Sequence, residues 1–337
     1  MESEQDYADL AETNFSYLES VEARKSRLWS HPMLNQKYWV KTPEGEGLYD
    51  VLYSYALRRK SGLYAVGLNR VGKTDALQKA ADRLRVAFPH MPVFIVIGKR
   101  LSNQSKEAFC KYLLDEFGYA VSAVPRRSSF ERILIHFLVA ECVACGGQHF
   151  QLLVDEAQLF SVTQYRYLLE IWNALKRPPG YLMCTALIGQ VELNTLKSLT
   201  AELDHTAVVA RFFVKCYAFH GIKSVDILRP ILRCYDVDLH YPETSPWTYS
   251  RYFAKNRFDK GWRLEKEADL FWRALVKVAK PQNTSSIVQN GFRMGWVVDT
   301  IHAFLVDAMT RDNKPWKSDV STWEKHLLAG SIEDMLV

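Results

Sequence analysis

The apolar positions of the chain follow two different patterns, and the change falls near residue 220. Before it, short apolar runs alternate with longer segments in which apolar residues recur every three or four positions. After it, the helical spacing dominates. Buried runs separated by helical segments are typical of parallel strands joined by helical crossovers. We therefore predict an α/β fold, a parallel five-stranded sheet sandwiched by helices and followed by a helical lid, with strands at 63–66, 93–97, 150–154, 181–188 and 214–219.

Helices are predicted between these strands and beyond the last one. Ser161 is expected to cap the helix that follows the third strand, because its hydroxyl can accept a hydrogen bond from the first helical turn. A polar and aromatic stretch, 236–261, separates the first two helices of the C-terminal region. The predicted helices are 75–84, 130–145, 162–176, 201–213, 222–235, 264–280 and 292–309.

The loop after the first strand carries the strongest chemical signal. Residues 67–74 read Gly-Leu-Asn-Arg-Val-Gly-Lys-Thr, which is the phosphate-binding P-loop pattern. Glycines allow the backbone N–H groups to approach a phosphate chain, Lys73 would reach the β- and γ-phosphates, and Thr74 would bind Mg²⁺. A solvent-exposed glycine turn is the alternative. The predicted nucleotide-binding residues are Gly67, Asn69, Arg70, Val71, Gly72, Lys73, Thr74 and Asp75.

Two adjacent acidic residues end the third predicted strand. Asp155 and Glu156 follow an apolar run, at the strand end where open α/β sheets place their ligand chemistry. Asp155 would hold Mg²⁺ together with Thr74, and Glu156 would polarise the water that attacks the γ-phosphate. Downstream of a P-loop, this pair predicts an ATPase that uses ATP and Mg²⁺.

Three further polar residues are candidates for the catalytic set. Gln190 follows the fourth strand, where a polar side chain would lie beside the γ-phosphate; capping of the strand end is the alternative. Arg211 precedes the last strand, a location that faces the neighbouring subunit in ring-forming ATPases; an intramolecular salt bridge is the alternative. Arg293 opens the last long helix and is expected to reach the γ-phosphate, unless it is an exposed surface arginine.

The distribution of charge and the composition of the chain also suggest what the protein binds and where it is located in the cell. Residues 1–22 hold seven acidic and no basic side chains, while basic residues dominate from there to about Arg132, in a chain of net charge +5. This asymmetry suggests a partner contact at one end and polyanion affinity in the other, although a solvated helix face explains the charges equally well. Without an apolar run near the roughly 18 residues of a membrane span, and with an acidic N-terminus, we expect a bacterial cytoplasmic protein.

Three segments follow from the motifs. Residues 1–40 are expected to form an acidic helical extension that contacts a partner, 41–220 the nucleotide-binding core, and 221–337 the helical lid with a C-terminal tail. Cys142 and Cys145 are expected to be two small core residues on the helix 130–145, because a structural zinc site needs further ligands at suitable spacing.

The ordered series of P-loop, Asp155-Glu156, Gln190, Arg211 and Arg293 resembles the AAA+ ATPases over roughly residues 40–310. Within that class the chain is similar to the TnsC/TniB transposition regulators of Tn7-like and CRISPR-associated transposons. Four local stretches carry this resemblance: 38–44 (Tyr-Trp-Val-Lys-Thr-Pro-Glu), the Asn-Arg-Val-Gly-Lys-Thr form of the P-loop, 187–193 (Leu-Ile-Gly-Gln-Val-Glu-Leu) and 210–212 (Ala-Arg-Phe).

The resemblance implies an ATPase that forms a hexameric or heptameric ring, or a filament, on duplex DNA. Such an assembly would be loaded by a TniQ/TnsD-type target-selection protein, and it would recruit a transposase that stimulates hydrolysis and disassembly. DNA contacts are expected to reach phosphates and to read few bases. Surface solvation is the alternative for each candidate contact, and these are Lys99, Arg100, Ser102, Asn103, Lys106, Arg126 and Arg127.

Other classes share parts of this pattern. A replication initiator or helicase loader has the same ATPase core, but only 44 residues follow Arg293, which we expect to leave no space for an added C-terminal DNA-reading domain. A signalling ATPase with repeat sensors is disfavoured because no internal repeats follow the core. A small-molecule P-loop kinase would need neither Arg211 at a subunit boundary nor the second acidic residue, Glu156.

Overall fold

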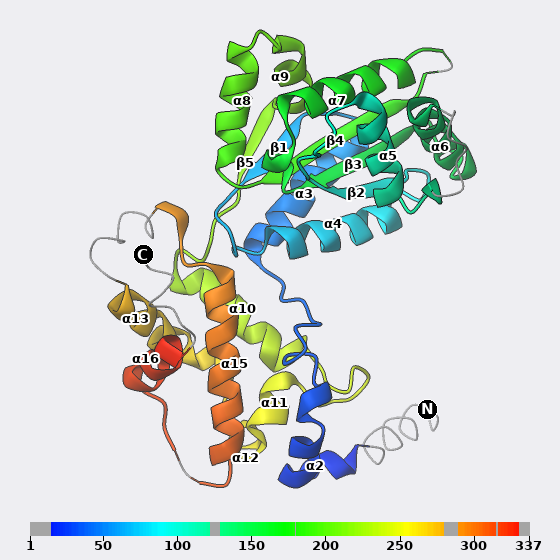
Figure 1. The fold of residues 1–337 in the computed structure, drawn as a ribbon. Helices are drawn as coiled ribbons and strands as arrows, with labels where there is room; N and C mark the ends of the chain where they lie inside the picture. The colour runs from blue at the N-terminus through cyan, green and yellow to red at the C-terminus, as the bar shows by residue number, and fades with distance from the viewer. Residues whose placement is uncertain (1–14, 122–128, 179, 280–288, 315, 330–337) are drawn as a thin grey trace. The chain divides into compact units, whose positions relative to one another are not determined.

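The computed structural model describes residues 15–121, 129–178, 180–279, 289–314 and 316–329 (Figure 1). The chain divides into two compact units. The nucleotide-binding unit is Glu44–His220, and the helical unit combines the segment before residue 44 with the segment after residue 220. Leu18, Met33 and Val40 are buried in one hydrophobic cluster with residues of the C-terminal segment. The described part of the N-terminal extension is therefore built into the helical unit.

The nucleotide-binding unit is organised around a five-stranded sheet, as the sequence predicts. Its order is β2-β3-β4-β1-β5, and every neighbouring pair is parallel. Because β1 lies between β4 and β5, the loop that leaves β1 emerges beside the end of β4, in the middle of the sheet. The strands are β1 Leu63–Val66, β2 Val93–Ile97, β3 His149–Asp155, β4 Leu182–Gly189 and β5 Lys215–Ala218.

Helices cover both faces of this sheet, and alternate residues of each strand face alternate layers. In β3, Leu152 and Val154 belong to one buried cluster, whereas Leu153 belongs to the other. The Leu153 cluster includes residues of α3 Pro43–Leu57 and α4 Lys73–Ala87. The opposite cluster includes residues of α5 Lys106–Glu116, α6 Phe130–Ala144, α7 Val162–Leu175, α8 Glu192–Glu202 and α9 Thr206–Phe212.

Two helix predictions have different outcomes. Ser161 does cap α7: its hydroxyl accepts a hydrogen bond from the Gln164 N–H, and the Gln164 side chain accepts one from the Ser161 N–H. The prediction of one helix over 201–213 is wrong. Asp204 has a φ of 59°, and this left-handed residue lies in the break between α8 and α9. The break was not predicted because the apolar residues keep a helical spacing across it.

The helical unit has an aromatic core. Trp323 of α16 is fully buried and stacks between Phe271 and Phe304, with ring centres 4.2 and 4.0 Å away. Within the described residues, no helix is long and apolar enough to cross a membrane. The main elements are η1 Ser16–Glu19, α2 Val21–Ser26, η2 Leu28–Ser30, α10 Val225–Val237, α11 Tyr249–Phe253, α12 Lys255–Asp259, η5 Leu264–Glu267, α13 Ala268–Val278, α15 Met294–Arg311 and α16 Val320–Ala329.

Arg24 of α2 attaches the N-terminal segment to this unit. Its side chain is buried, and Nη1 donates a hydrogen bond of 2.6 Å to the carbonyl of Tyr252. Nη2 lies 3.7 Å from the Asp312 carboxylate, and the Tyr252 hydroxyl donates back to the Arg24 carbonyl. A buried guanidinium is tolerated when it is paired and hydrogen-bonded in this way. The segment around α2 is thus fixed by polar contacts as well as by apolar packing.

His31 lies nearby in a cage of aromatic rings. It is 0% exposed, and the ring centres of Tyr249, Tyr241 and Tyr252 are 4.4, 4.5 and 4.7 Å from its own. The Met33 N–H donates to Nδ1 at 3.1 Å, which places the ring proton of the neutral form on Nε2. Burial, with a smaller effect of His302, lowers the pKa of His31 to about 3. The imidazole is therefore a neutral core group.

Candidate nucleotide site

The P-loop connects β1 to α4 and depends on two glycines for different reasons. Gly72 has a φ of 96° immediately before α4 begins at Lys73, a conformation that favours glycine. At Gly67 the limit is space, because a Cβ there would lie 2.4 Å from the carbonyl oxygen of Phe219. The first N–H groups of α4 have no acceptor within the helix, so this turn presents donors and a positive dipole end to an anion.

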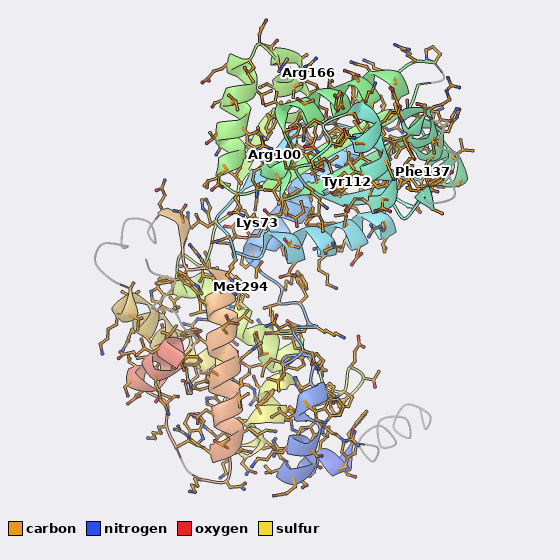
Figure 2. All side chains as sticks on the ribbon, viewed as in Figure 1. Lys73, Arg100, Tyr112, Phe137, Arg166 and Met294 are labelled. Carbon is orange, nitrogen blue, oxygen red and sulfur yellow. The ribbon has the colours of Figure 1, made fainter. Side chains whose placement is uncertain are left out.

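Lys73 is the buried cation of this loop (Figure 2). It is 6% exposed, and Nζ donates to the carbonyl of Gly67 at 3.0 Å and to that of Leu68 at 2.6 Å. Burial lowers the pKa of Lys73, while Glu156 and Asp155 act in the opposite direction. An ammonium group has three donors, so one proton is left for a phosphate oxygen in addition to the two carbonyl contacts.

Asp155, at the end of β3, joins the P-loop to the acidic pair. Its Oδ2 accepts a hydrogen bond of 2.7 Å from the Thr74 hydroxyl, and its Oδ1 accepts one of 2.9 Å from the Glu156 N–H. Burial, followed by the Asp155 charge, raises the pKa of the neighbouring Asp75 carboxyl. A hydroxyl and a carboxylate in direct contact are hard oxygen donors of the kind that Mg²⁺ prefers, so this pair fits the predicted metal.

Glu156 lies in a strained backbone position beside the metal pair. Its φ and ψ are 46° and 38°, a left-handed conformation that is uncommon for a residue with a side chain. Its carboxylate accepts hydrogen bonds from the side-chain amides of Gln158 and Gln190, the latter at 3.4 Å. The structure therefore brings Gln190, predicted from the end of β4, to the carboxylate predicted to act on water.

Gln158 was missed by the sequence reasoning. Besides its bond to Glu156, its Oε1 accepts a hydrogen bond of 3.0 Å from the Gln190 N–H, so one side chain links the ends of β3 and β4. A Cβ at Gly189 would lie 2.4 Å from this Oε1, so the glycine makes room for the amide. The sequence feature that could have identified Gln158 is its amide side chain two residues after Glu156, in the short turn Ala157–Leu159.

The two candidate arginines lie outside this network. Arg211, in α9, places its guanidinium carbon 3.8 Å from the centre of the Trp172 ring. Its Nε is buried without a hydrogen-bond partner, and it makes no ion pair with any described residue, so its intramolecular contact is a cation–π contact. Arg293 belongs to the helical unit, precedes α15, and has its guanidinium 4.9 Å from the centre of the Trp296 ring.

The predicted DNA contacts fall into three groups. Lys99, Arg100, Ser102 and Asn103 are exposed in the loop after β2; Figure 2 labels Arg100. The loop backbone is held in place, since the Gln164 amide donates to the Lys99 carbonyl at 2.9 Å.

Lys106, at the start of α5, differs from these. It pairs with Glu131 at 2.6 Å and Glu170 at 2.7 Å, and its two carboxylate partners raise its pKa despite partial burial. Arg126 and Arg127 lie outside the described residues.

Comparison with known proteins agrees with this geometry. The family model described as an AAA domain matches residues 57–196, and no curated protein sequence gives a significant match. The Aeropyrum pernix ORC2 protein, solved as ADPNP-ADP complexes, has 12% identity and a TM-score of 0.57, over 89% of this chain and 71% of that one. The A. pernix ORC1 protein in complex with DNA has 15% identity and a TM-score of 0.51, over 91% and 69%. The chain therefore has the AAA+ P-loop NTPase fold, with structural similarity to the A. pernix ORC1 and ORC2 proteins.

Proposed function

We propose that this protein is an ATPase that assembles on duplex DNA and uses ATP hydrolysis to control the lifetime of the assembly. The observation that carries the proposal is the side-chain hydrogen bond between Thr74, which directly follows Lys73 in the P-loop, and Asp155, which directly precedes Glu156. These residues belong to separate segments of the sequence, and each has the chemistry that one part of ATP hydrolysis requires.

Each residue has a distinct role in this proposal. Lys73 and the first N–H groups of α4 bind the phosphates, while Thr74 and Asp155 hold Mg²⁺. The metal supplies positive charge against the phosphate oxygens. Glu156 orients the attacking water and accepts its proton, and Gln190 and Gln158 fix the direction of that carboxylate through their amide hydrogen bonds. Arg211 acts on the site of a neighbouring subunit, and Arg293 contacts the γ-phosphate from the helical unit.

The loop after β2 is the proposed DNA-contacting element. Lys99 and Arg100 project cations from a backbone that is anchored to α7, and neither has an ion-pair partner among the described residues. Lys106 is a weaker candidate, because Glu131 and Glu170 already neutralise its charge. Contacts of this kind to phosphates give binding that is sequence-tolerant and weakens steeply with salt.

The specific pathway that we propose is DNA transposition. It is supported by the resemblance to TnsC/TniB regulators in the four stretches around residues 38–44, 69–74, 187–193 and 210–212. In this pathway a TniQ/TnsD-type protein selects the target and loads the ATPase, and the transposase engages the DNA-bound assembly and stimulates hydrolysis.

A second candidate is a replication initiator or helicase loader. It is favoured by the fold similarity to the A. pernix ORC1 and ORC2 proteins, the first of which was solved in complex with DNA. Both candidates use an ATP-dependent contact with duplex DNA, and they differ in the protein that the assembly recruits.

The test is electron microscopy of the purified protein with duplex DNA, with and without a slowly hydrolysed ATP analogue. We expect rings or filaments threaded by DNA only when the analogue is present. A variant with both Lys99→Glu and Arg100→Glu should still bind the analogue but lose the DNA-threaded assemblies, whereas Lys111→Glu, which changes an exposed lysine of α5, is the matched control. Protein that remains monomeric and ignores DNA in the presence of the analogue would reject the proposal.

A second measurement separates the two candidates. Purified transposase or replicative helicase, each taken from the same genome, is added to the DNA-bound assemblies while ATP turnover is followed. Transposase that accelerates turnover and disassembles the particles supports the transposition role. A response to the helicase alone supports the initiator or loader role.

A further inference from the structure

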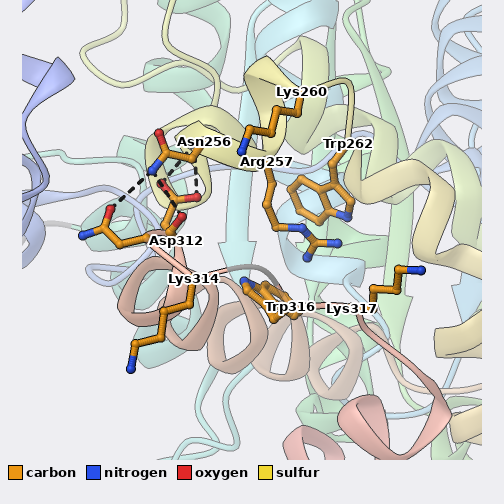
Figure 3. Close-up of a pocket in the computed structure, with 9 residues that line it drawn as sticks. Asn256, Arg257, Lys260, Trp262, Asp312, Lys314, Trp316 and Lys317 are labelled. Atoms are coloured by element: carbon orange, nitrogen blue, oxygen red, sulfur yellow. Dashed lines mark hydrogen bonds between the residues drawn. The ribbon is translucent and has the colours of Figure 1, made fainter.

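The helical unit contains a pocket that the proposed ATPase mechanism does not use (Figure 3). It measures about 660 Å³, and its walls come from α12 with the residues that follow it and from the segment after α15. Two tryptophans, Trp262 and Trp316, form an apolar part of the wall, and the remaining lining residues are polar or charged. A pocket of this size can accept several side chains of a peptide.

Arg257 is held in a fixed position inside this pocket. Its guanidinium carbon lies 3.9 Å from the centre of the Trp316 ring and 4.8 Å from that of Trp262, and Figure 3 shows the side chain extending between the two indoles. Nη2 is 3.9 Å from a Glu267 carboxylate oxygen, whereas Nη1 has no hydrogen-bond partner among the described residues. Nη1 is buried as well as unpartnered, so the part of the guanidinium that remains exposed carries the attraction for an incoming carboxylate or phosphate.

The charges around Arg257 strengthen the preference for an anion. Lys260, Lys314 and Lys317 are exposed at the pocket, and none of the three has an ion-pair partner in the described part of the chain. The one acidic lining residue, Asp312, is already engaged: its carboxylate accepts from the Asn256 N–H at 3.1 Å and faces Arg24. Arg257 and three exposed lysines therefore line a pocket whose single carboxylate has other partners.

The shape of the pocket favours a protein carboxylate over duplex DNA. The Arg257 side chain is only 18% exposed, so its ligand must enter the pocket, and the phosphates of a rigid double helix lie on a broad cylinder. Base stacking on Trp262 is also disfavoured, because its ring already contacts the Arg257 guanidinium and the stacked ring of Phe304. An aspartate or glutamate side chain is narrow enough to reach the guanidinium from a peptide backbone at the rim.

The chain itself contains an acidic segment whose charge is complementary to the pocket and which is connected to the chain close to it. Its first 14 residues include five carboxylates and no lysine or arginine. The described chain starts next to the pocket: Glu19 pairs with Lys255 at 2.6 Å, and Lys255 directly precedes the pocket residues Asn256 and Arg257. At about 3.3 Å per extended residue, 14 residues span up to about 46 Å, which is ample for the pocket of the same copy.

We propose that the pocket around Arg257 binds carboxylates of the acidic N-terminal segment, residues 1–14, of the same or a neighbouring copy. In the first case the segment covers its own basic pocket, and in the second it links adjacent subunits. The proposal does not depend on ATP binding or on DNA, so it can fail while the proposed ATPase function stands.

The test uses the full-length protein and a carbodiimide, which joins a lysine amine to a carboxylate only where the two are in contact. Mass spectrometry should find cross-links from Lys260, Lys314 or Lys317 to acidic residues of the 1–14 segment. A mixture of ¹⁴N- and ¹⁵N-labelled protein distinguishes the two sources, because a link between different copies carries both labels.

Three variants give the test its controls. Exchanging the five N-terminal carboxylates for amides should abolish the cross-links. Lys314→Glu together with Lys317→Glu should reduce the yield at Lys260 by at least about fivefold, the effect of losing roughly 1 kcal/mol of charge attraction. Lys325→Glu, an exposed lysine of α16 outside the pocket, should leave that yield unchanged.

Two results would overturn the proposal. One is a cross-link yield at the pocket lysines no higher than at Lys325. The other is a loss of duplex-DNA affinity in the Lys314→Glu, Lys317→Glu variant without any link to the N-terminal segment, which would make the pocket a nucleic-acid site. Because both lysines are exposed, an unchanged melting temperature is expected to accompany either outcome.

Discussion

The two units of this protein use polar side chains in opposite ways. In the nucleotide-binding unit, Lys73, Asp155 and Glu156 each contact another group of the site, so these polar groups hold one another in position. In the helical unit the buried polar groups Arg24 and His31 serve the core, while the cations of the Arg257 pocket keep donors unused. The mutual contacts of the polar groups in the nucleotide site suit a chemical reaction, whereas the exposed cations of the Arg257 pocket suit the binding of a partner.

The largest expected effect comes from Lys73→Ala, which tests whether the positioned site binds nucleotide at all. Removing a buried ammonium that points into the phosphate loop should abolish detectable ATP binding: the lost hydrogen bond to a charged group alone contributes roughly 1.5–3 kcal/mol, or about 10- to 150-fold, and the lost positive charge weakens binding further. Isothermal titration with an ATP analogue measures the change, and Lys79→Ala on the exposed face of α4 is the control. If Lys73→Ala binds the ATP analogue as tightly as the wild type does, the P-loop is not the nucleotide site, and the contrast between the two units no longer holds.

Arg211→Ala tests whether the nucleotide site is complete within one chain. If Arg211 acts across a subunit boundary, its loss should lower ATP turnover by about 10³-fold, the scale of an arginine finger. Mixing this variant with Lys73→Ala subunits should restore part of the turnover, because each supplies what the other lacks. Mixing with a Lys73→Ala, Arg211→Ala double variant should restore none. If the first mixture also stays inactive, Arg211 serves only its contact with Trp172.

Glu156→Gln separates binding from hydrolysis within the same site. The amide keeps the size of the side chain but cannot accept the proton of water, so turnover should fall by at least about 10²-fold while analogue affinity stays the same. DNA-bound assemblies should consequently persist in the presence of ATP. Turnover at the wild-type rate would mean that another group activates the water.

His31→Phe tests the core role of polar groups in the helical unit. Because the folded state holds the pKa of His31 near 3 and the unfolded state near 6.5, the unfolded chain binds the proton first as the pH falls. The free energy of unfolding should therefore drop below pH 6.5, by about 1.4 kcal/mol per pH unit from this residue, or about 2 kcal/mol at pH 5. The variant should lose this part of the pH dependence in urea denaturation at pH 7 and pH 5.

The matched control for that experiment is His136→Gln, which changes an exposed histidine of α6. Only a change in pH dependence that His31→Phe shows and His136→Gln does not is assigned to the aromatic cage. A His31→Phe protein that loses as much stability on acidification as the wild type would show that the aromatic cage does not exclude the proton.

The smallest effect is expected for Gln158→Ala, which tests how much of the site depends on positioning. Loss of the bridge between Glu156 and the Gln190 N–H should lower turnover by about tenfold, equivalent to about 1.4 kcal/mol, with little change in nucleotide affinity. Gln158→Glu keeps an acceptor for Gln190 but places a second carboxylate beside Glu156, so it should shift the pH profile of turnover towards higher pH. Equal profiles for wild type and both variants would assign Gln158 a purely structural role.

The parts that could be predicted from sequence are those with local causes. The five strands follow from short apolar runs, and Gly72, Lys73 and Thr74 follow from a loop whose conformation is set within eight residues. The contact of Thr74 with Asp155 follows from the rule that strand ends of a parallel sheet share one edge.

The remaining features depend on contacts between distant residues. Gln158 gains its place only because Gly189 leaves space on the neighbouring strand. The N-terminal segment joins the C-terminal one through Arg24 and Tyr252, which are 228 residues apart. Arg257 and Trp316 are too far apart in sequence for any local pattern to predict their stacking, so the pocket was not predicted.

One contact beside the P-loop has a mechanical consequence. The carbonyl oxygen of Phe219 lies where a side chain on Gly67 would be, and the Phe219 N–H donates to the Val66 carbonyl at 2.7 Å. The C-terminal segment of the helical unit begins at Gly221, two residues further along the chain. The P-loop thus packs directly against the backbone of Phe219, one residue before the nucleotide-binding unit ends at His220. A change in the backbone position of Gly67 must therefore be accommodated by the backbone at Phe219, close to the residue where the nucleotide-binding unit ends.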